Sequence, residues 1–102
     1  MYMSVTSEKQ LINALKAVAD PTRLRILRLL KQKGHCSIGK REGMCARDIE
    51  EEIRLTQPTI SHHMAVLSKS GLVQAEKQGL WIWYRRNEKA LKELGHALSA
   101  NV

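Results

Sequence analysis

The sequence has few cysteines and no long apolar segment, and each shortage argues against a class of protein. Two cysteines, Cys36 and Cys45, are too few for a small disulfide-stabilised scaffold. A membrane-spanning helix needs about 18 or more consecutive apolar residues, and no such run occurs. The first residues, MYMSVTSEKQ, have neither a basic start nor an apolar stretch, so no secretion signal is expected. The expectation is a reduced, cytoplasmic protein that does not enter a membrane.

Acidic residues are scarce beside basic ones. The chain of 102 residues carries 17 Lys and Arg against 10 Asp and Glu, which gives a formal charge of +7. A positive excess favours a polyanionic partner, usually nucleic acid and less often an anionic membrane surface, although many small basic proteins bind no specific partner. The length suits one domain, residues 1–102, with one hydrophobic core.

Apolar periodicity predicts a mainly helical chain with one β-hairpin. Asp20-Pro21 is a typical helix start, because the carboxylate caps the backbone and proline suits the first turn. The second helix is expected to bury Leu24, and the glycine-containing segment 34–44 is expected to be a loop. Beyond Gly71 the period changes to two, and Gln78-Gly79 is expected to form the hairpin turn. Helices are expected over 7–19, from 21 to the glycine at 34, around 49–53, over 56–69 and from 87 onward, and strands over 73–77 and 80–86.

One of these helices contains two adjacent histidines, in the stretch LTQPTISHHMAVLSKSGLV (55–73). His62 is expected to face solvent, whereas His63 lies at the edge of the apolar stripe and is expected to be half-buried and hydrogen-bonded. Adjacent histidines on a helix point about 100° apart, so they are poorly placed to chelate one metal ion. The inward stripe consists of Ile60, Met64, Leu67 and Gly71.

The outward face of the same helix carries small and polar side chains, which suits the major groove of DNA. Small residues allow a close approach, and Gln57, Thr59, Ser61 and His62 can hydrogen-bond base edges or phosphates. The alternative is an ordinary solvated helix face. The short helix and tight connection before it favour DNA binding, because together they resemble a helix-turn-helix.

The predicted hairpin is basic and can lie along phosphates as a wing. Lys77 lies at its turn, and Arg85 and Arg86 lie at its exit. Trp81 and Trp83 alternate with other apolar residues, so both faces of the second strand are apolar. Most of these aromatic residues are expected to belong to the core.

Three segments of the chain resemble the ArsR/SmtB family of winged-helix transcriptional repressors. They are ADPTRLRILRLL (19–30), LTQPTISHHMAVLSKSGLV (55–73) and GLWIWYR (79–85). The resemblance covers about residues 8–95 and implies a winged helix-turn-helix, mainly α with a small β-hairpin wing, in the order four helices, hairpin, last helix. Members of that family are cytoplasmic homodimers that repress operons and leave DNA when an effector binds. The resemblance therefore implies an inverted-repeat, double-stranded operator as partner and no required cofactor.

The resemblance also assigns residues by position. The terminal helices would form the dimer interface, and the fourth helix and the wing would contact DNA. The implied DNA-contacting residues are Thr56, Gln57, Thr59, Ser61, His62, His63, Lys69, Lys77, Gln78 and Arg85. The implied dimer-interface residues are Leu11, Ile12, Leu15, Leu91, Leu94 and Leu98.

The family's arsenic-responsive branch carries Cys-Val-Cys-Asp at the start of the third helix, where this chain has Cys45-Ala46-Arg47-Asp48. A site for arsenite or a soft divalent metal needs two or three thiolates or similar ligands, so Cys36 would supply the second and His35 a third. Three interpretations stay open: such a metal or metalloid site, a redox disulfide between the two cysteines, and two inert thiols. The family's zinc-type site on the last helix is not expected, because His96 has no second ligand at a suitable spacing.

The sequence thus predicts a DNA-binding repressor and not an enzyme, because no nucleophile and base with an orienting group can be recognised. The first alternative is a regulator of the same fold that is either redox-controlled or independent of any effector, and Arg47 in place of a cysteine favours the second of these. A protein-interaction adaptor whose basic charge is incidental is the second. Salt separates them, because DNA binding through several phosphates weakens steeply as salt rises.

Overall fold

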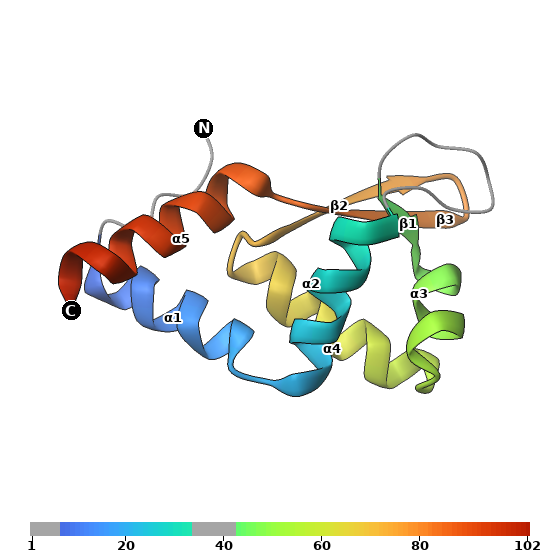
Figure 1. Ribbon diagram of the computed structural model, residues 1–102. Coiled ribbons are helices and arrows are strands. Elements are labelled where there is room, and N and C mark those ends of the chain that lie inside the picture. The colour runs from blue at the N-terminus through green and yellow to red at the C-terminus, as the bar shows by residue number, and fades with distance from the viewer. Residues whose placement is uncertain (1–6, 34–42) are drawn as a thin grey trace.

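The computed structural model describes residues 7–33 and 43–102. Helices α1 and α5 lie side by side at one end of the molecule, α2 and α4 occupy the middle, and α3 and the sheet lie at the other end (Figure 1). The predicted winged helix-turn-helix, mainly α with a hairpin, is confirmed. The elements are α1 (Glu8–Val18), α2 (Pro21–Lys33), β1 (Met44–Cys45), α3 (Ala46–Ile53), α4 (Gln57–Lys69), β2 (Val73–Gln78), β3 (Trp81–Arg86) and α5 (Glu88–Asn101).

Short polar side chains cap the starts of α1, α2 and α5, where Ser7, Asp20 and Asn87 accept backbone N–H groups. The backbone N–H of Arg23 donates to the Asp20 carboxylate at 3.0 Å, so the predicted start of α2 at Asp20-Pro21 is confirmed. The N–H of Ala90 donates in the same way to Oδ1 of Asn87 at 3.1 Å, which starts α5. Asn87 also donates through Nδ2 to the carbonyl of Gly71 at 3.0 Å, which ties the start of α5 to the segment that follows α4.

The sheet has three antiparallel strands in the order β1-β3-β2, one more than expected. In the additional strand, Met44 pairs with Tyr84 and Cys45 pairs with Trp83. Two residues are too few to show an alternating pattern, and their partner strand lies far along the chain. Local sequence therefore gives no sign of β1, and the segment was expected to be part of a loop.

The hairpin turn lies one residue later than expected. Gln78 pairs with Trp81, so Gly79 and Leu80 form the two-residue turn and the prediction of Gln78-Gly79 is wrong. Gly79 has φ +60, a left-handed conformation that a residue without Cβ adopts at little cost. Glycine thus takes the first turn position, and Leu80 is left fully exposed at the tip of the wing.

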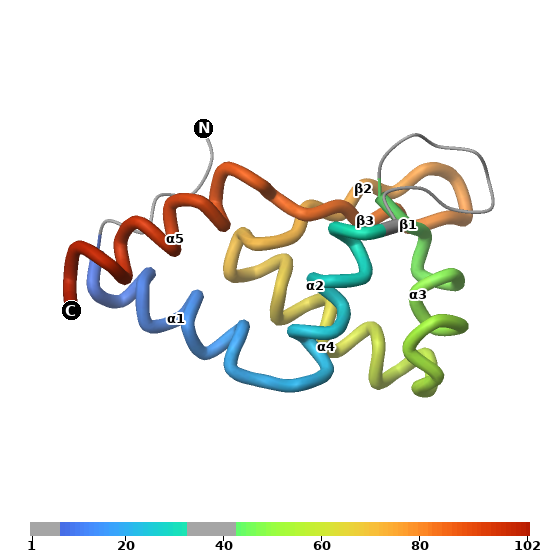
Figure 2. Tube along the Cα trace, in the orientation of Figure 1, coloured from blue at the N-terminus to red at the C-terminus, as the bar shows by residue number. Residues whose placement is uncertain are grey.

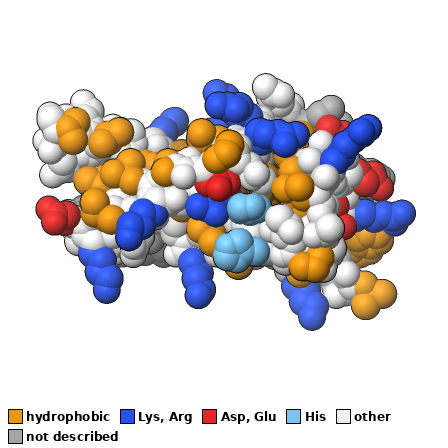
Figure 3. Space-filling model, turned by 90° about the horizontal axis from the view of Figure 1, so that it is seen from below, with side chains coloured by type: hydrophobic (Ala, Val, Ile, Leu, Met, Phe, Trp, Pro, Cys, Tyr) orange, Lys and Arg blue, Asp and Glu red, His pale blue; other side chains and the backbone are white. Residues whose placement is uncertain are grey.

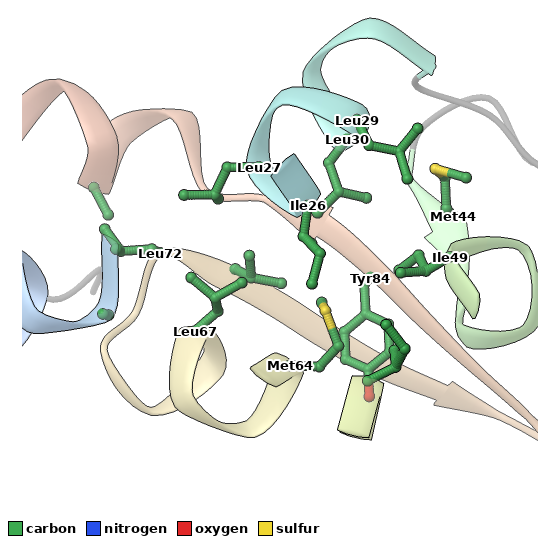
Figure 4. Close-up of a cluster of buried hydrophobic side chains, with 14 of the residues drawn as sticks. Ile26, Leu27, Leu29, Leu30, Met44, Ile49, Met64, Leu67, Leu72 and Tyr84 are labelled. Carbon is green, nitrogen blue, oxygen red and sulfur yellow. The ribbon is translucent and has the colours of Figure 1, made fainter. Parts of the chain in front are cut away.

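The core lies where α2, α3, α4 and the sheet meet (Figure 4). Ile26 of α2 and Leu72, just before β2, are completely buried there. The inward stripe predicted for α4 is confirmed at Ile60, Met64 and Leu67, which are all buried. Each side chain of this size contributes about 1.5–3 kcal/mol when it leaves water, so α4 is held firmly against the core and its opposite face is left to solvent.

The prediction for α2 is wrong in one respect, because Leu24 is exposed. This helix packs against α1, α3, α4 and β3 with a face centred near Ile26 and Leu30, and at about 100° per residue Leu24 lies roughly 160° from Ile26, outside that face. Ile26 and Leu29 complete that face beside Leu27 and Leu30. Within the described ranges, no helix combines the length and the apolar character needed to cross a membrane.

The apolar residues of β3 divide between core and surface. Trp83 and Tyr84 are buried, as expected, and burial raises the pKa of the Tyr84 phenol. The expectation that most of the aromatic residues there are core is therefore confirmed at Trp83 and Tyr84, in the half of β3 that β1 also covers, whereas Trp81 and the neighbouring Ile82 are exposed.

Candidate nucleic-acid interface

A tight turn joins α3 to α4 and brings a polar helix to the surface. Arg54 ends α3 with a left-handed backbone, φ +64. Thr56 occupies the N-cap position of α4, as expected, and Pro58 lies in the first turn, where its missing N–H costs least. The Thr56 hydroxyl lies 2.9 Å from that of Thr59 and does not cap the backbone. Two of the predicted DNA-contacting hydroxyls therefore form a pair at the start of the helix.

The outward face of α4 is polar and exposed, as expected. Gln57 donates through Nε2 to Oγ of Ser61 at 2.8 Å, which orders two neighbouring side chains on this face. Figure 3 shows histidine side chains near the middle of one face of the molecule, with Lys and Arg side chains spread along it. Such a face offers donors and acceptors to base edges and positive charge to phosphates. The exposed residues of α4 among those predicted to contact DNA are Gln57, Thr59, Ser61, His62 and Lys69.

The two histidines have different surroundings. Their ring centroids lie 5.6 Å apart with the planes tilted by 57°, and His62 is exposed. The His63 side chain is only 13% exposed, and its Nδ1 lies 3.1 Å from Nη1 of Arg23 and 4.0 Å from the Asp20 carboxylate. Burial lowers the pKa of His63, and the charge of Arg23 acts in the same direction against that of Asp20. The predicted half-buried, hydrogen-bonded state of His63 is confirmed.

Arg23 is a neighbour of this surface that the sequence analysis did not single out. The signal is present in ADPTRLRILRLL, where an arginine follows a capping aspartate by one helical turn. Its partner His63 lies in a different segment of the chain, so only the fold brings the two together.

Three of the residues predicted to contact DNA lie on the hairpin that forms the wing. Lys77 is exposed near its tip, on β2. Gln78 donates to the Glu76 carboxylate at 3.0 Å, and Arg85 donates to Oε1 of Gln74 at 3.2 Å. Gln78 and Arg85 are thus oriented by β2 itself.

The predicted sensor residues are only partly described. Cys45 is 1% exposed, in β1 beside Trp83, and so the thiol belongs to the core. Cys36 and His35 lie outside the described residues. Arg47 is exposed. Among residues 7–33 and 43–102, no three His, Cys, Asp or Glu side chains gather as a metal site would require.

The terminal helices leave apolar side chains exposed at one end of the molecule. Figure 2 shows α1 and α5 running alongside each other, away from α3. Ile12 on α1 is 44% exposed and Leu98 on α5 is 38% exposed, and both line a pocket of about 230 Å³ with Val102. Of the other predicted interface residues, Leu11 and Leu94 are buried within the chain, and Leu15 and Leu91 are half-buried.

Residues 20–75 match a family model described as "Bacterial regulatory protein, arsR family". The match begins at the cap of α2, includes both helices of the helix-turn-helix and ends in β2, and it covers more than half of the chain. The chain belongs to the arsR family of bacterial regulatory proteins. Members are transcriptional regulators, so this ArsR-family chain is a regulator of transcription and not an enzyme.

The ArsR-family chain is 43% identical over 79 residues to an uncharacterized HTH-type transcriptional regulator of Methanocaldococcus jannaschii, across 78% of this chain and 80% of the relative. It is 39% identical over 88 residues to the arsenical resistance operon repressor of Staphylococcus aureus, across 86% and 76% of the two chains. The solution structure of a homodimeric winged helix-turn-helix DNA-binding domain from Mycobacterium bovis shares the fold, with a TM-score of 0.69 and 24% identity over 96% of this chain and 89% of that one.

Proposed function

We propose that this ArsR-family regulator is a repressor that reads a specific operator with the exposed face of α4. The observation that carries the proposal is the row of exposed polar side chains on that face, which includes Gln57, Ser61 and His62. Such a helix enters the major groove, where base edges present distinct patterns of donors and acceptors. Lys77 and Arg85 of the wing contact phosphates, in keeping with the net charge of +7. The protein acts in the cytoplasm, because its DNA partner lies there.

The repressor acts as a homodimer of single-domain chains, residues 1–102, on an inverted-repeat operator. Exposed Ile12 and Leu98 support this arrangement, since a two-fold axis beside α1 and α5 would bury both on each chain. The M. bovis domain of the same fold is homodimeric, which supports it further. Two copies of α4 would then meet successive major grooves, about one DNA turn apart.

The test begins with a duplex selected from a random library by the wild-type protein and measured by fluorescence anisotropy. We expect His62→Ala to weaken binding to the selected duplex about 10-fold and binding to random duplex less than about 2-fold, because a base contact carries specificity and a phosphate contact does not. Equal losses on both duplexes would make His62 a phosphate contact. If the wild-type protein selected no duplex and its binding showed no salt dependence, the repressor proposal would fail.

The proposed effector is arsenite or a soft divalent metal bound by Cys45 and Cys36, with His35 as a third ligand. The 39% identical relative named as an arsenical resistance operon repressor supports it. Because the Cys45 thiol is buried at the start of α3, capture would have to draw it out of the core and would disturb α3, which packs on α4. No cofactor is needed for DNA binding itself.

We expect arsenite to release the selected duplex from the reduced wild-type protein and not from Cys45→Ser. The same titration with a thiol oxidant tests the redox alternative, in which a Cys36–Cys45 disulfide releases DNA. A protein indifferent to both reagents would be an effector-independent regulator, an alternative that the exposed Arg47 and the buried Cys45 favour.

A further inference from the structure

The Arg23 side chain lies where α1, α2 and α4 meet, and it bonds to two of these helices besides its own. Its Nε donates to the carbonyl of Ala17 at 2.6 Å, and its Nη2 donates to the carbonyl of Lys16 at 3.3 Å. Both carbonyls belong to the last turn of α1, where the helix has no backbone partners left to offer. The third nitrogen, Nη1, lies 3.1 Å from Nδ1 of His63 on α4. One guanidinium therefore connects the end of α1 to α4.

The chemistry of the contact fixes the state of His63. A guanidinium only donates hydrogen bonds, so Nδ1 of His63 has to accept, and the ring proton of the neutral imidazole has to be on Nε2. Burial and the charge of Arg23 both lower the pKa of His63, in agreement with a neutral ring. The Asp20 carboxylate accepts the backbone N–H of Arg23 at 3.0 Å, which fixes the first turn of α2 from which the Arg23 side chain extends.

The connection joins the two surfaces on which the proposed function rests. Helix α1 carries Ile12 of the proposed dimer interface, and α4 carries the side chains proposed to read DNA. A dimer binds an inverted repeat only when its two recognition helices are spaced to match the two half-sites. Any change in the angle between α1 and α4 is doubled by the two-fold axis.

We propose that Arg23 is a positioning residue for DNA recognition, which holds α4 at a fixed orientation to α1 through His63 and so sets the spacing of half-sites that the dimer accepts. The inference rests on the proposed function, because it needs a dimer that binds DNA. The three bonds of Arg23 use its Nε–H and one N–H on each of Nη1 and Nη2, so contacts within the chain set the direction of the guanidinium. Lysine cannot replace it, because one ammonium on a flexible stem lacks the planar fork that reaches three acceptors.

The experiment compares two duplexes, the one selected by the wild-type protein and the same sequence lengthened by a few base pairs between its half-sites. We expect Arg23→Lys to bind the selected duplex about 10-fold more weakly and to lose most of the preference for it over the lengthened one. In Arg23→Gln, which removes the charge as well as the planar fork, the dependence of affinity on salt should stay as in the wild type, because no phosphate contact is lost. Arg28→Gln is the matched control, since it removes a charge from an exposed site on the same helix and should leave the spacing preference intact.

Two substitutions of His63 test the same contact from α4, so the test does not depend on whether Arg23→Lys folds. His63→Leu removes the acceptor and should lose the spacing preference, whereas His63→Asn returns an oxygen near the place of Nδ1 and should retain it. Long-range ¹⁵N NMR of the wild-type imidazole should show a single tautomer with its proton on Nε2, and a mixture in Arg23→Lys.

Each outcome decides between the inference and its alternatives. An unchanged spacing preference in Arg23→Lys and His63→Leu, with normal wild-type binding, would overturn the inference alone. A salt slope flattened by about one unit in Arg23→Gln, with the spacing preference intact, would make Arg23 a phosphate contact and overturn it as well. A wild-type protein that selects no duplex would overturn the proposed function, and the inference with it.

Discussion

Leu98→Glu is expected to convert the dimer to a monomer and to weaken binding to the selected duplex at least about 100-fold, because each chain then holds a half-site without help from the other. Leu98 is 38% exposed on α5 and shares its pocket with Ile12 of α1. A two-fold interface over this pocket would bury two new carboxylates close together, and an unpaired buried charge costs several kcal/mol. Sedimentation velocity measures the mass, and anisotropy measures the affinity.

His96→Glu is the matched control for this prediction. It puts the same carboxylate on α5, but two residues away and therefore on nearly the opposite side of the helix, and His96 is exposed. We expect it to remain dimeric and to bind DNA with close to wild-type affinity. A dimeric Leu98→Glu would place the interface elsewhere on the molecule, and two monomeric variants would mean that added negative charge alone separates the chains.

Gly43→Ala is expected to destabilise the fold by about 3 kcal/mol or more and to lower the Tm by at least roughly 12 °C. Gly43 has φ +86, where an L side chain is strained. A Cβ there would lie 2.4 Å from the backbone oxygen of Tyr84 and 2.7 Å from Nε1 of Trp83, so β1 would have to separate from β3. Thermal unfolding followed by circular dichroism gives the Tm.

Gly79→Ala separates crowding from backbone strain. Gly79 also has a positive φ, +60, but a Cβ there would meet no atom within 4 Å. Its replacement should therefore cost only about 1–2 kcal/mol from the left-handed conformation. If Gly43→Ala were no more destabilising than Gly79→Ala, the tight contact between β1 and β3 would not be important for stability.

The sequence predicted those parts of the fold that rest on local rules. The apolar spacing in α4 separated Ile60, Met64 and Leu67 from an outward polar face, and it gave His62 and His63 their different surroundings. The start of α2 followed from the hydrogen-bonding chemistry of aspartate before proline. In each case the residues in and next to a single helix are sufficient for the prediction.

The remaining features depend on contacts between distant segments. The sequence near Met44 does not predict a strand, because β1 forms only through its pairing with β3. Leu24 was misplaced because the elements around α2 decide which side of the helix is buried. The contact from Arg23 to His63 joins α2 to α4, and neither segment shows by itself that it will form. Only the folded chain shows that α4, the candidate DNA-reading helix, is held by a side chain of α2.

The strand order β1-β3-β2 also bears on how the protein behaves at high concentration. The most apolar strand, β3, lies in the centre of the sheet, and β1 occupies its second edge at Trp83 and Tyr84. An apolar strand with an open edge is a template for pairing with another copy and for aggregation. The outer strand β2 carries Glu76 and Lys77, whose charges discourage such pairing. A strand of two residues thus keeps the edge of β3 at Trp83 and Tyr84 from pairing with another copy.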